Sequence, residues 1–194
     1  HDPQNPDWEE RDRVFWSAGH KAPALYVSLG MSGYFDVADM VTLRKLGSPF
    51  PGHPHRLKLA GVEVSSGSLG QGLSIAIGSA LAARLDKKDY RVYCIMGDGE
   101  QQEGQVWEAA MEACHYRLDN LCAIVDCNGL QIDGCIDDVM CIEPLADKYR
   151  SFGFEVISTD GHDIGQILEA FRKAREQKGR PSVILARTVK GKGV

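Results

Sequence analysis

The stretch Val92-Tyr-Cys-Ile-Met-Gly-Asp-Gly-Glu100 decides the fold. Its pattern is typical of a buried strand that ends in a glycine-rich turn containing an acidic residue. Val92 to Met96 is apolar, and similar runs recur at Leu121 to Val125 and Val183 to Ala186, with Phe154 to Ile157 as a weaker fourth. Short apolar runs separated by helical stretches are typical of a parallel sheet whose faces are covered by helices. The sequence therefore predicts a doubly wound α/β fold.

Apolar residues at helical spacing fill the segments between these strands. The expected sheet-covering helices are Gly70 to Leu85, Glu103 to Tyr116 and Asp163 to Gln177. Within residues 1–60, which are rich in Pro and Gly, we expect two short helices, about Ala22 to Leu29 and Val37 to Leu46, and loop elsewhere. Helices are thus predicted on both faces of the sheet.

Length, charge and cysteine usage narrow the class of protein. The 194 residues suffice for one core, so we expect a single domain, 1–194, from which terminal residues are missing because the chain does not begin with Met. The net charge of -5 disfavours nucleic acid as a partner, and no apolar run approaches the roughly 20 residues that span a membrane. Six cysteines without a CxxC pair, two of them (Cys94 and Cys122) in expected strands, predict a reduced, cytoplasmic protein.

An acid and an amide follow two of the predicted strands. Asp98 comes directly after Met96-Gly97, and Asn128 comes directly after Val125-Asp126-Cys127. Ligands collect beyond the carboxyl ends of parallel strands, so Asp98 and Asn128 meet there if the two strands are neighbours. One carboxylate, one amide oxygen, a backbone carbonyl and diphosphate oxygens satisfy octahedral Mg²⁺. The sequence predicts a magnesium site here; the alternative is a Gly-Asp-Gly turn that only closes a strand.

A second glycine cluster, Ser65-Ser-Gly-Ser-Leu-Gly-Gln-Gly72, directly precedes the first predicted sheet-covering helix. Exposed amides and the positive end of a helix bind anions, so a diphosphate fits here, although a plain loop-to-helix cap is the alternative. The pattern is not GxGxxG and no P-loop lysine follows, which disfavours nicotinamide and nucleoside triphosphate sites. His20 and His53 lie in loops, and their spacing matches no compact metal motif.

Several short motifs, taken together in their order and spacing, resemble the transketolase family. They are Asn5-Pro6 with Arg11-Asp12-Arg13, Ser17-Ala-Gly-His20, Gly52-His-Pro54, Gly67-Ser-Leu-Gly-Gln-Gly72, Gly97-Asp-Gly-Glu-Gln-Gln-Glu-Gly104 and Asp126-Cys-Asn-Gly129. The resemblance covers essentially the whole chain. It implies the domain that binds the diphosphate and Mg²⁺ of thiamine diphosphate, in an enzyme that moves a two-carbon ketol unit between sugar phosphates, as in the pentose phosphate pathway.

The resemblance also implies roles for individual residues. The metal, Mg²⁺ or alternatively Ca²⁺ or Mn²⁺, is held by Asp98, Asn128 and the Leu130 carbonyl. The cofactor is lined by His20, Gly67, Ser68, Leu69, Gly99 and Asn128. The implied catalytic residues are His20 near the diphosphate, His53 facing the sugar substrate, and Glu103. In the family, the acid that Glu103 matches faces the subunit interface and helps to link two active sites; the alternative for Glu103 is a first-turn acid that stabilises its own helix.

This chain departs from the family pattern at some positions. Ser68 stands where the family usually has Pro, and His55 stands where an acid is common, but neither change removes a ligand. An upstream Ser-Gly-His-Pro histidine and a downstream substrate histidine have no match here. The glutamate that protonates the aminopyrimidine belongs to the domain that follows. We therefore expect a companion chain that carries the pyrimidine-binding and C-terminal domains, in a heterotetramer, although a fragment of one longer polypeptide also fits.

Two other functions stay open at this point. The alpha subunit of a 2-oxo-acid dehydrogenase, or a deoxyxylulose-phosphate synthase, also carries Gly-Asp-Gly, but Ser17 to His20, Gly52 to Pro54 and Glu103-Gly104 fit transketolase better. The second is a cofactor-binding homologue that stabilises a partner without turnover.

Overall fold

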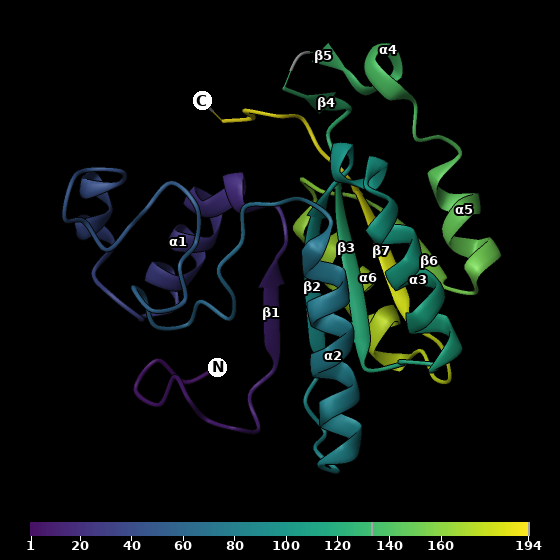
Figure 1. Cartoon of the computed structure of the whole chain (residues 1–194), viewed down its shortest axis with the longest axis horizontal. Coiled ribbons are helices and arrows are strands. Elements are labelled where there is room, and N and C mark those ends of the chain that lie inside the picture. The colour runs from purple at the N-terminus through teal and green to yellow at the C-terminus, as the bar shows by residue number, and fades with distance from the viewer. Residues whose placement is uncertain (133, 194) are drawn as a thin grey trace.

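The computed structural model describes residues 1–132 and 134–193, and a parallel sheet lies at its centre (Figure 1). Within these residues, five strands form the main sheet in the order β1-β2-β3-β7-β6. Their bounds are β1 (Arg13–Trp16), β2 (Val92–Gly97), β3 (Leu121–Cys127), β6 (Glu155–Asp160) and β7 (Ser182–Arg187). Every neighbouring pair in this sheet is parallel. All four predicted strands are therefore confirmed.

Strand β1 was not expected, and the prediction of loop for this segment is wrong. Residues Arg13 to Trp16 pair with Val92 to Ile95 of β2, at the edge of the sheet. Within β1, Phe15 alone is fully buried. A four-residue edge strand with one inward side chain lacks the continuous apolar run of a central strand, so its pattern does not distinguish it from loop.

Helices cover both faces of the sheet, as predicted (Figure 1). On one face lie α2 (Gln71–Leu85), α3 (Gly104–His115) and α5 (Leu145–Phe152), and on the other lies α6 (Ile164–Glu176). The side chains of β3 alternate between the two faces: Ala123 joins the core beneath α2 and α3, whereas Cys122 packs with Ala174 of α6. Burial on both faces explains why β3 reads as a continuous apolar run.

The predicted helices differ in how well the structure bears them out. Helices α2, α3 and α6 lie close to their expected bounds, and α1 (Ala22–Met31) confirms the first short helix. The second, expected at Val37 to Leu46, is instead a shorter 3-10 helix, η2 (Val37–Thr42). None of the η2 residues is buried, so no apolar stripe holds a longer α-helix there.

Several short elements complete the chain. Beyond the carboxyl ends of the strands lie η1 (Gly19–Lys21), η3 (Gly99–Gln102), the antiparallel pair β4 (Leu130–Gln131) and β5 (Gly134–Cys135), and α4 (Ile136–Met140). Beside β1, helix α1 forms a small separate core with Phe50 and Val62 (Figure 1). In the described part of the chain, no helix has the length and apolar character needed to cross a membrane. The six cysteines are free thiols, and Cys94 and Cys122 are buried in strands as predicted.

Candidate functional site

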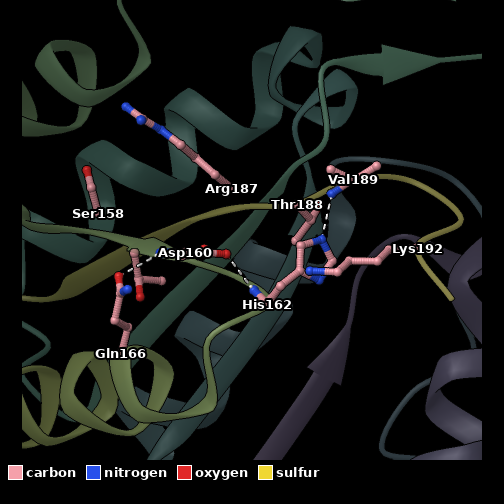
Figure 2. A pocket seen from close by; sticks show the side chains of 9 residues that line it. Ser158, Asp160, His162, Gln166, Arg187, Thr188, Val189 and Lys192 are labelled. Atoms are coloured by element: carbon pink, nitrogen blue, oxygen red, sulfur yellow. Dashed lines mark hydrogen bonds between the residues drawn. The ribbon is translucent and has the colours of Figure 1, made fainter.

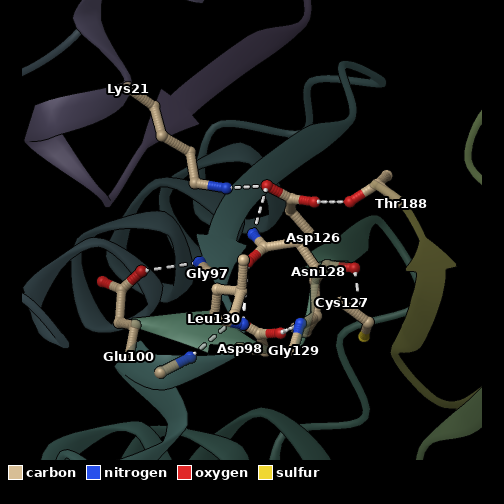
Figure 3. A network of polar contacts seen from close by, with 12 residues as sticks. Lys21, Gly97, Asp98, Glu100, Asp126, Cys127, Asn128, Gly129, Leu130 and Thr188 are labelled. Atoms are coloured by element: carbon tan, nitrogen blue, oxygen red, sulfur yellow. Dashed lines mark hydrogen bonds and ion pairs between the residues drawn. The ribbon is translucent and has the colours of Figure 1, made fainter. Parts of the chain in front are cut away.

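Asp98 lies at the carboxyl end of β2, directly beside the end of β3. The register pairs Gly97 with Asp126, and the Asp98 amide donates to the Asp126 carbonyl at 3.2 Å. Strands β2 and β3 are therefore neighbours, which is the condition on which the predicted meeting of Asp98 and Asn128 depends. The Asp98 carboxylate accepts from Gly99 N at 2.8 Å and from Gly129 N at 2.6 Å (Figure 3).

The Asp98 carboxylate is buried, with 3% of its surface exposed. Burial raises the pKa of Asp98 above its usual value, and the amides of Gly129 and Gly99 oppose this shift only in part. Among the residues that the structure describes, no Lys, Arg or His forms an ion pair with it. A buried carboxylate without a cationic side chain is well suited to a bound metal ion.

Asn128 and Leu130 lie in the turn that follows β3. The side-chain oxygen of Asn128 accepts from Leu130 N at 3.0 Å, and its nitrogen donates to Asp126 Oδ2 at 3.2 Å. This turn also holds Gly129, whose amide contacts Asp98, so the three predicted metal ligands come together. The described residues contain no group of three His, Cys, Asp or Glu side chains that fits a metal. One carboxylate with neutral oxygens is instead the donor set that suits Mg²⁺ beside a diphosphate.

Asp126 stands at the centre of a polar network that joins three parts of the chain (Figure 3). Lys21 donates to its Oδ2 and Thr188 donates to its Oδ1. Burial alone would raise the pKa of Asp126, but the hydrogen bonds from Lys21 and Thr188 outweigh burial, and the pKa lies below its usual value. Asp126 is therefore an anion that couples η1, β3 and the end of β7.

Glu100 fastens the glycine cluster to the Asp98 turn. Its side chain is buried, and it accepts from Gly97 N at 3.0 Å, from Gly70 N at 2.8 Å and from the Ser17 hydroxyl. The Ser17 oxygen in turn accepts from Gly72 N at 3.0 Å. One carboxylate thus holds together the segments that follow β1 and β2 and the loop that precedes α2.

The loop before α2 is closely packed, and glycine is required at one position within it and at one position in the segment that lies against it. Gly70 has φ +81°, and a Cβ there would lie 2.7 Å from Glu103 Cβ. A Cβ on Gly19 would lie 2.7 Å from Gly67 N, so the segment that leads to His20 runs directly against this loop. In the described chain, the amides of Gly67, Ser68 and Leu69 donate to no protein acceptor. Free amides at the start of a helix are suited to bind an anion.

The two predicted histidines lie beside the same loop. A Cβ on Gly67 would lie 3.6 Å from His53 Cδ2, and His20 directly follows Gly19. Both side chains are exposed. Burial of part of the ring lowers the pKa of His20; the charge of Lys21 adds to this effect and that of Glu100 opposes it, so the neutral imidazole is favoured at pH 7.

Glu103 is the N-cap residue of α3 and is exposed to solvent. Its side chain makes no capping hydrogen bond, and it packs against Gly70 of the glycine cluster. The alternative of a first-turn acid is wrong, because Glu103 is the N-cap and precedes the first turn of α3.

Gln101 connects the turn that holds Asp98 to the core through hydrogen bonds. Its side chain is buried, its nitrogen donates to Gly97 O at 2.9 Å, and its oxygen accepts from the Tyr149 hydroxyl of α5 at 2.6 Å. Burial raises the pKa of Tyr149 far above its usual value, so this hydroxyl stays protonated and donates.

Replacing Tyr149 by Phe is expected to lower the free energy of unfolding by about 1 to 3 kcal/mol, because the buried Gln101 oxygen loses its donor. Urea unfolding of the two proteins measures this difference. Tyr116→Phe is the matched control, since Tyr116 is 45% exposed and should change stability by less than about 0.5 kcal/mol. Equal stability of Tyr149→Phe and wild type would contradict the role of this hydrogen bond.

An open cavity of about 580 Å³ lies at the carboxyl ends of β6 and β7 (Figure 2). Its polar groups largely bind one another. Asp160 accepts from His162 N at 2.8 Å, and the His162 ring accepts from Val189 N at 2.8 Å. Thr188, which lines this cavity, donates to Asp126, so the cavity adjoins the Asp126 network, but it is not lined by Asp98, Asn128 or Leu130.

The residues that connect the parts of the site were not predicted from the sequence. Glu100 and Gln101 lie in the Gly97 to Gly104 motif and Asp126 lies in the Asp126 to Gly129 motif, so their place in these motifs was a usable signal. Lys21 and Thr188 carry no such signal, because each meets Asp126 only through the tertiary fold.

Comparison with known proteins places this geometry in a family. The model of the transketolase thiamine diphosphate binding domain matches residues 1–194. A 6-deoxy-6-sulfo-D-fructose transketolase subunit from a Clostridium species is 47% identical over 192 residues, which cover 99% of this chain and 70% of the relative. An apulose-4-phosphate transketolase subunit from Phocaeicola vulgatus is 43% identical, with 99% of this chain and 68% of that protein covered.

Solved structures agree with these relatives. The crystal structure of transketolase from Campylobacter jejuni superposes with a TM-score of 0.90 and 38% identity, covering 97% of this chain. This chain spans only 30% of that enzyme's length. Family model, relatives and fold all agree with the resemblance seen in the motifs, and the chain belongs to the transketolase family as a thiamine diphosphate-binding domain.

Proposed function

We propose that this chain binds the diphosphate of thiamine diphosphate through Mg²⁺ held by Asp98, Asn128 and the Leu130 carbonyl. The observation that carries the proposal is the buried Asp98 carboxylate, which has no cationic partner among the described residues and accepts from Gly129 N in the turn that holds Asn128. The donor set suits Mg²⁺, and Ca²⁺ or Mn²⁺ would fit the same oxygens.

The glycine cluster supplies the second half of the cofactor site. The free amides of Gly67, Ser68 and Leu69 donate to diphosphate oxygens, with Gly99 and neutral His20 beside them. When bound, thiamine diphosphate supplies the nucleophilic carbon of ketol transfer. His53, exposed next to Gly67, donates to a hydroxyl of the sugar substrate or exchanges a proton with it.

The assembled enzyme is proposed to be a transketolase-type transferase made from two different chains. Its relatives named as subunits extend beyond the region that matches this chain, and the C. jejuni enzyme extends much further. A companion chain with the pyrimidine-binding and C-terminal domains would complete the site, in a heterotetramer in which Glu103 faces the subunit interface. The exposed carboxylate of Glu103 supports that orientation.

The proposed substrates are sugars that carry an anionic group. Ketose phosphates are the first candidates as donors and aldose phosphates as acceptors, and the names of the two relatives that are subunits add 6-deoxy-6-sulfo-D-fructose and apulose 4-phosphate. The ketoses among these compounds have a ketol unit at one end and an anionic group at the other. A cofactor-binding homologue without turnover is the competing function, and it predicts the same cofactor site.

The test is ketol transfer by the full-length chain with its companion, using xylulose 5-phosphate as donor and ribose 5-phosphate as acceptor. We expect turnover that disappears when the companion, thiamine diphosphate or Mg²⁺ is omitted. The two substrates named for the relatives are assayed in parallel. Turnover without any companion chain contradicts the split enzyme, and cofactor binding without turnover of any substrate supports the non-catalytic homologue.

A further inference from the structure

We infer that Asp126 is a positioning residue that turns the side-chain oxygen of Asn128, and not its nitrogen, toward the metal position. The inference rests on the proposed function, because it takes Asn128 as a metal ligand. Lys21 and Thr188 hold Asp126 in place for this role (Figure 3).

An asparagine ligand presents a choice between two nearly equivalent orientations. Rotating the amide by half a turn exchanges oxygen and nitrogen with little change in shape, but only the oxygen can bind Mg²⁺. The protein around Asn128 must therefore select one orientation. Residues that orient a metal ligand in this way strongly affect metal affinity.

Both contacts of the Asn128 amide select the same orientation. Asp126 Oδ2 is a carboxylate oxygen that can only accept, so the Asn128 nitrogen must face it, and the two atoms lie 3.2 Å apart. On the other side, Leu130 N can only donate, and it reaches the Asn128 oxygen at 3.0 Å. The oxygen consequently lies on the side of the turn that holds Leu130, the third proposed ligand.

Asp126 can impose this choice because its own carboxylate is fixed at both ends. Thr188, just after β7, donates to Oδ1, and Lys21 of η1 donates to Oδ2. Oδ2 thus accepts from both Lys21 and Asn128, which uses its two lone pairs. Asp126 is thereby directed to Asn128 and away from direct metal binding. The Lys21 side chain is 16% exposed and that of Asp126 29%, so water competes only partly for the pair.

Asp126→Leu tests the orientation, because it removes both carboxylate oxygens at similar side-chain volume. The Asn128 nitrogen then has no carboxylate to donate to, and only Leu130 N still contacts the amide. The amide is held less firmly, and its nitrogen can face the metal. In the full-length protein with its companion, we expect Mn²⁺ affinity in the presence of thiamine diphosphate, measured by electron paramagnetic resonance, to fall about 10- to 100-fold.

Adding Asn128→Asp to Asp126→Leu is expected to recover most of the lost affinity. A carboxylate at position 128 presents oxygen in either orientation, and the double variant has the same net charge as wild type. A role for Asp126 in stability alone predicts no such rescue. Thr188→Val, which removes one hydroxyl, is expected to weaken Mn²⁺ binding about 2- to 10-fold, and it serves if Asp126→Leu does not fold.

The controls separate this inference from the proposed function. Asp138→Leu makes the same chemical change at an exposed acid of α4 and should leave Mn²⁺ affinity unchanged. Wild type without cofactor-dependent Mn²⁺ binding overturns the proposed function and the inference together. Binding that Asp98→Ala removes, but that survives Asp126→Leu, overturns the inference alone, as does a loss that Asn128→Asp fails to restore in a folded double variant.

Discussion

Replacing Asp98 by Ala is expected to weaken Mg²⁺-dependent binding of thiamine diphosphate by more than about 100-fold, beyond the loss typical of residues that only orient a ligand. Asp98 is the single carboxylate of the proposed ligand set, and no cationic side chain of the described residues pairs with it. Ketol transfer by the assembled protein should fall in parallel, because the cofactor is no longer retained. Isothermal titration of the cofactor, with and without Mg²⁺, measures the change.

The interpretation of Asp98→Ala depends on the fold staying intact. The substitution also removes the acceptor of the amides of Gly99 and Gly129, which costs about 1 to 3 kcal/mol for each amide that water does not reach. Thermal unfolding therefore accompanies the titration. Asp138→Ala removes the same charge from exposed α4 and should bind cofactor normally. Full cofactor affinity in folded Asp98→Ala would mean that the metal site is wrongly assigned.

Replacing Glu100 by Ala is expected to lower the free energy of unfolding by about 3 kcal/mol or more, because each buried donor left without an acceptor costs about 1 to 3 kcal/mol. The donors are Gly97 N, Gly70 N and the Ser17 hydroxyl. The loop that carries Asp98 and the loop that carries the free amides of Gly67, Ser68 and Leu69 are then no longer joined by one carboxylate. We therefore also expect weaker cofactor binding, although Glu100 is not a proposed ligand.

Comparing Glu100→Gln with Glu100→Ala separates the loss of the negative charge from the loss of the whole side chain. Glu100→Gln keeps one acceptor oxygen but sets an amide nitrogen against one of the donors, so its loss should be about 1 to 3 kcal/mol, smaller than that of Glu100→Ala. Glu108→Ala, on the surface of α3, should change stability by less than about 0.5 kcal/mol. Urea unfolding measures the stability of each variant. If Glu100→Ala is as stable as Glu108→Ala, the hydrogen bonds of Glu100 do not hold the loops together.

The proximity of Asp98 to the turn that holds Asn128 was predicted correctly, because its signal is local. Strand β2 is apolar up to Met96 and ends in Gly-Asp-Gly, and β3 repeats this order with Asn128. Parallel strands bring their carboxyl ends to one edge, so the two residues meet once β2 and β3 are neighbours. Whether these residues bind Mg²⁺ stays a prediction.

The amino-acid sequence by itself determined the α/β class, the central strands, the helices that cover them and the residue types at the strand ends, because these depend on periodicity within short segments. Only the tertiary structure decided what joins them. Edge strand β1 exists through its pairing with β2, and Lys21, Asp126 and Thr188 come from distant segments. Contacts between such segments depend on three-dimensional packing, and no spacing along the chain encodes them.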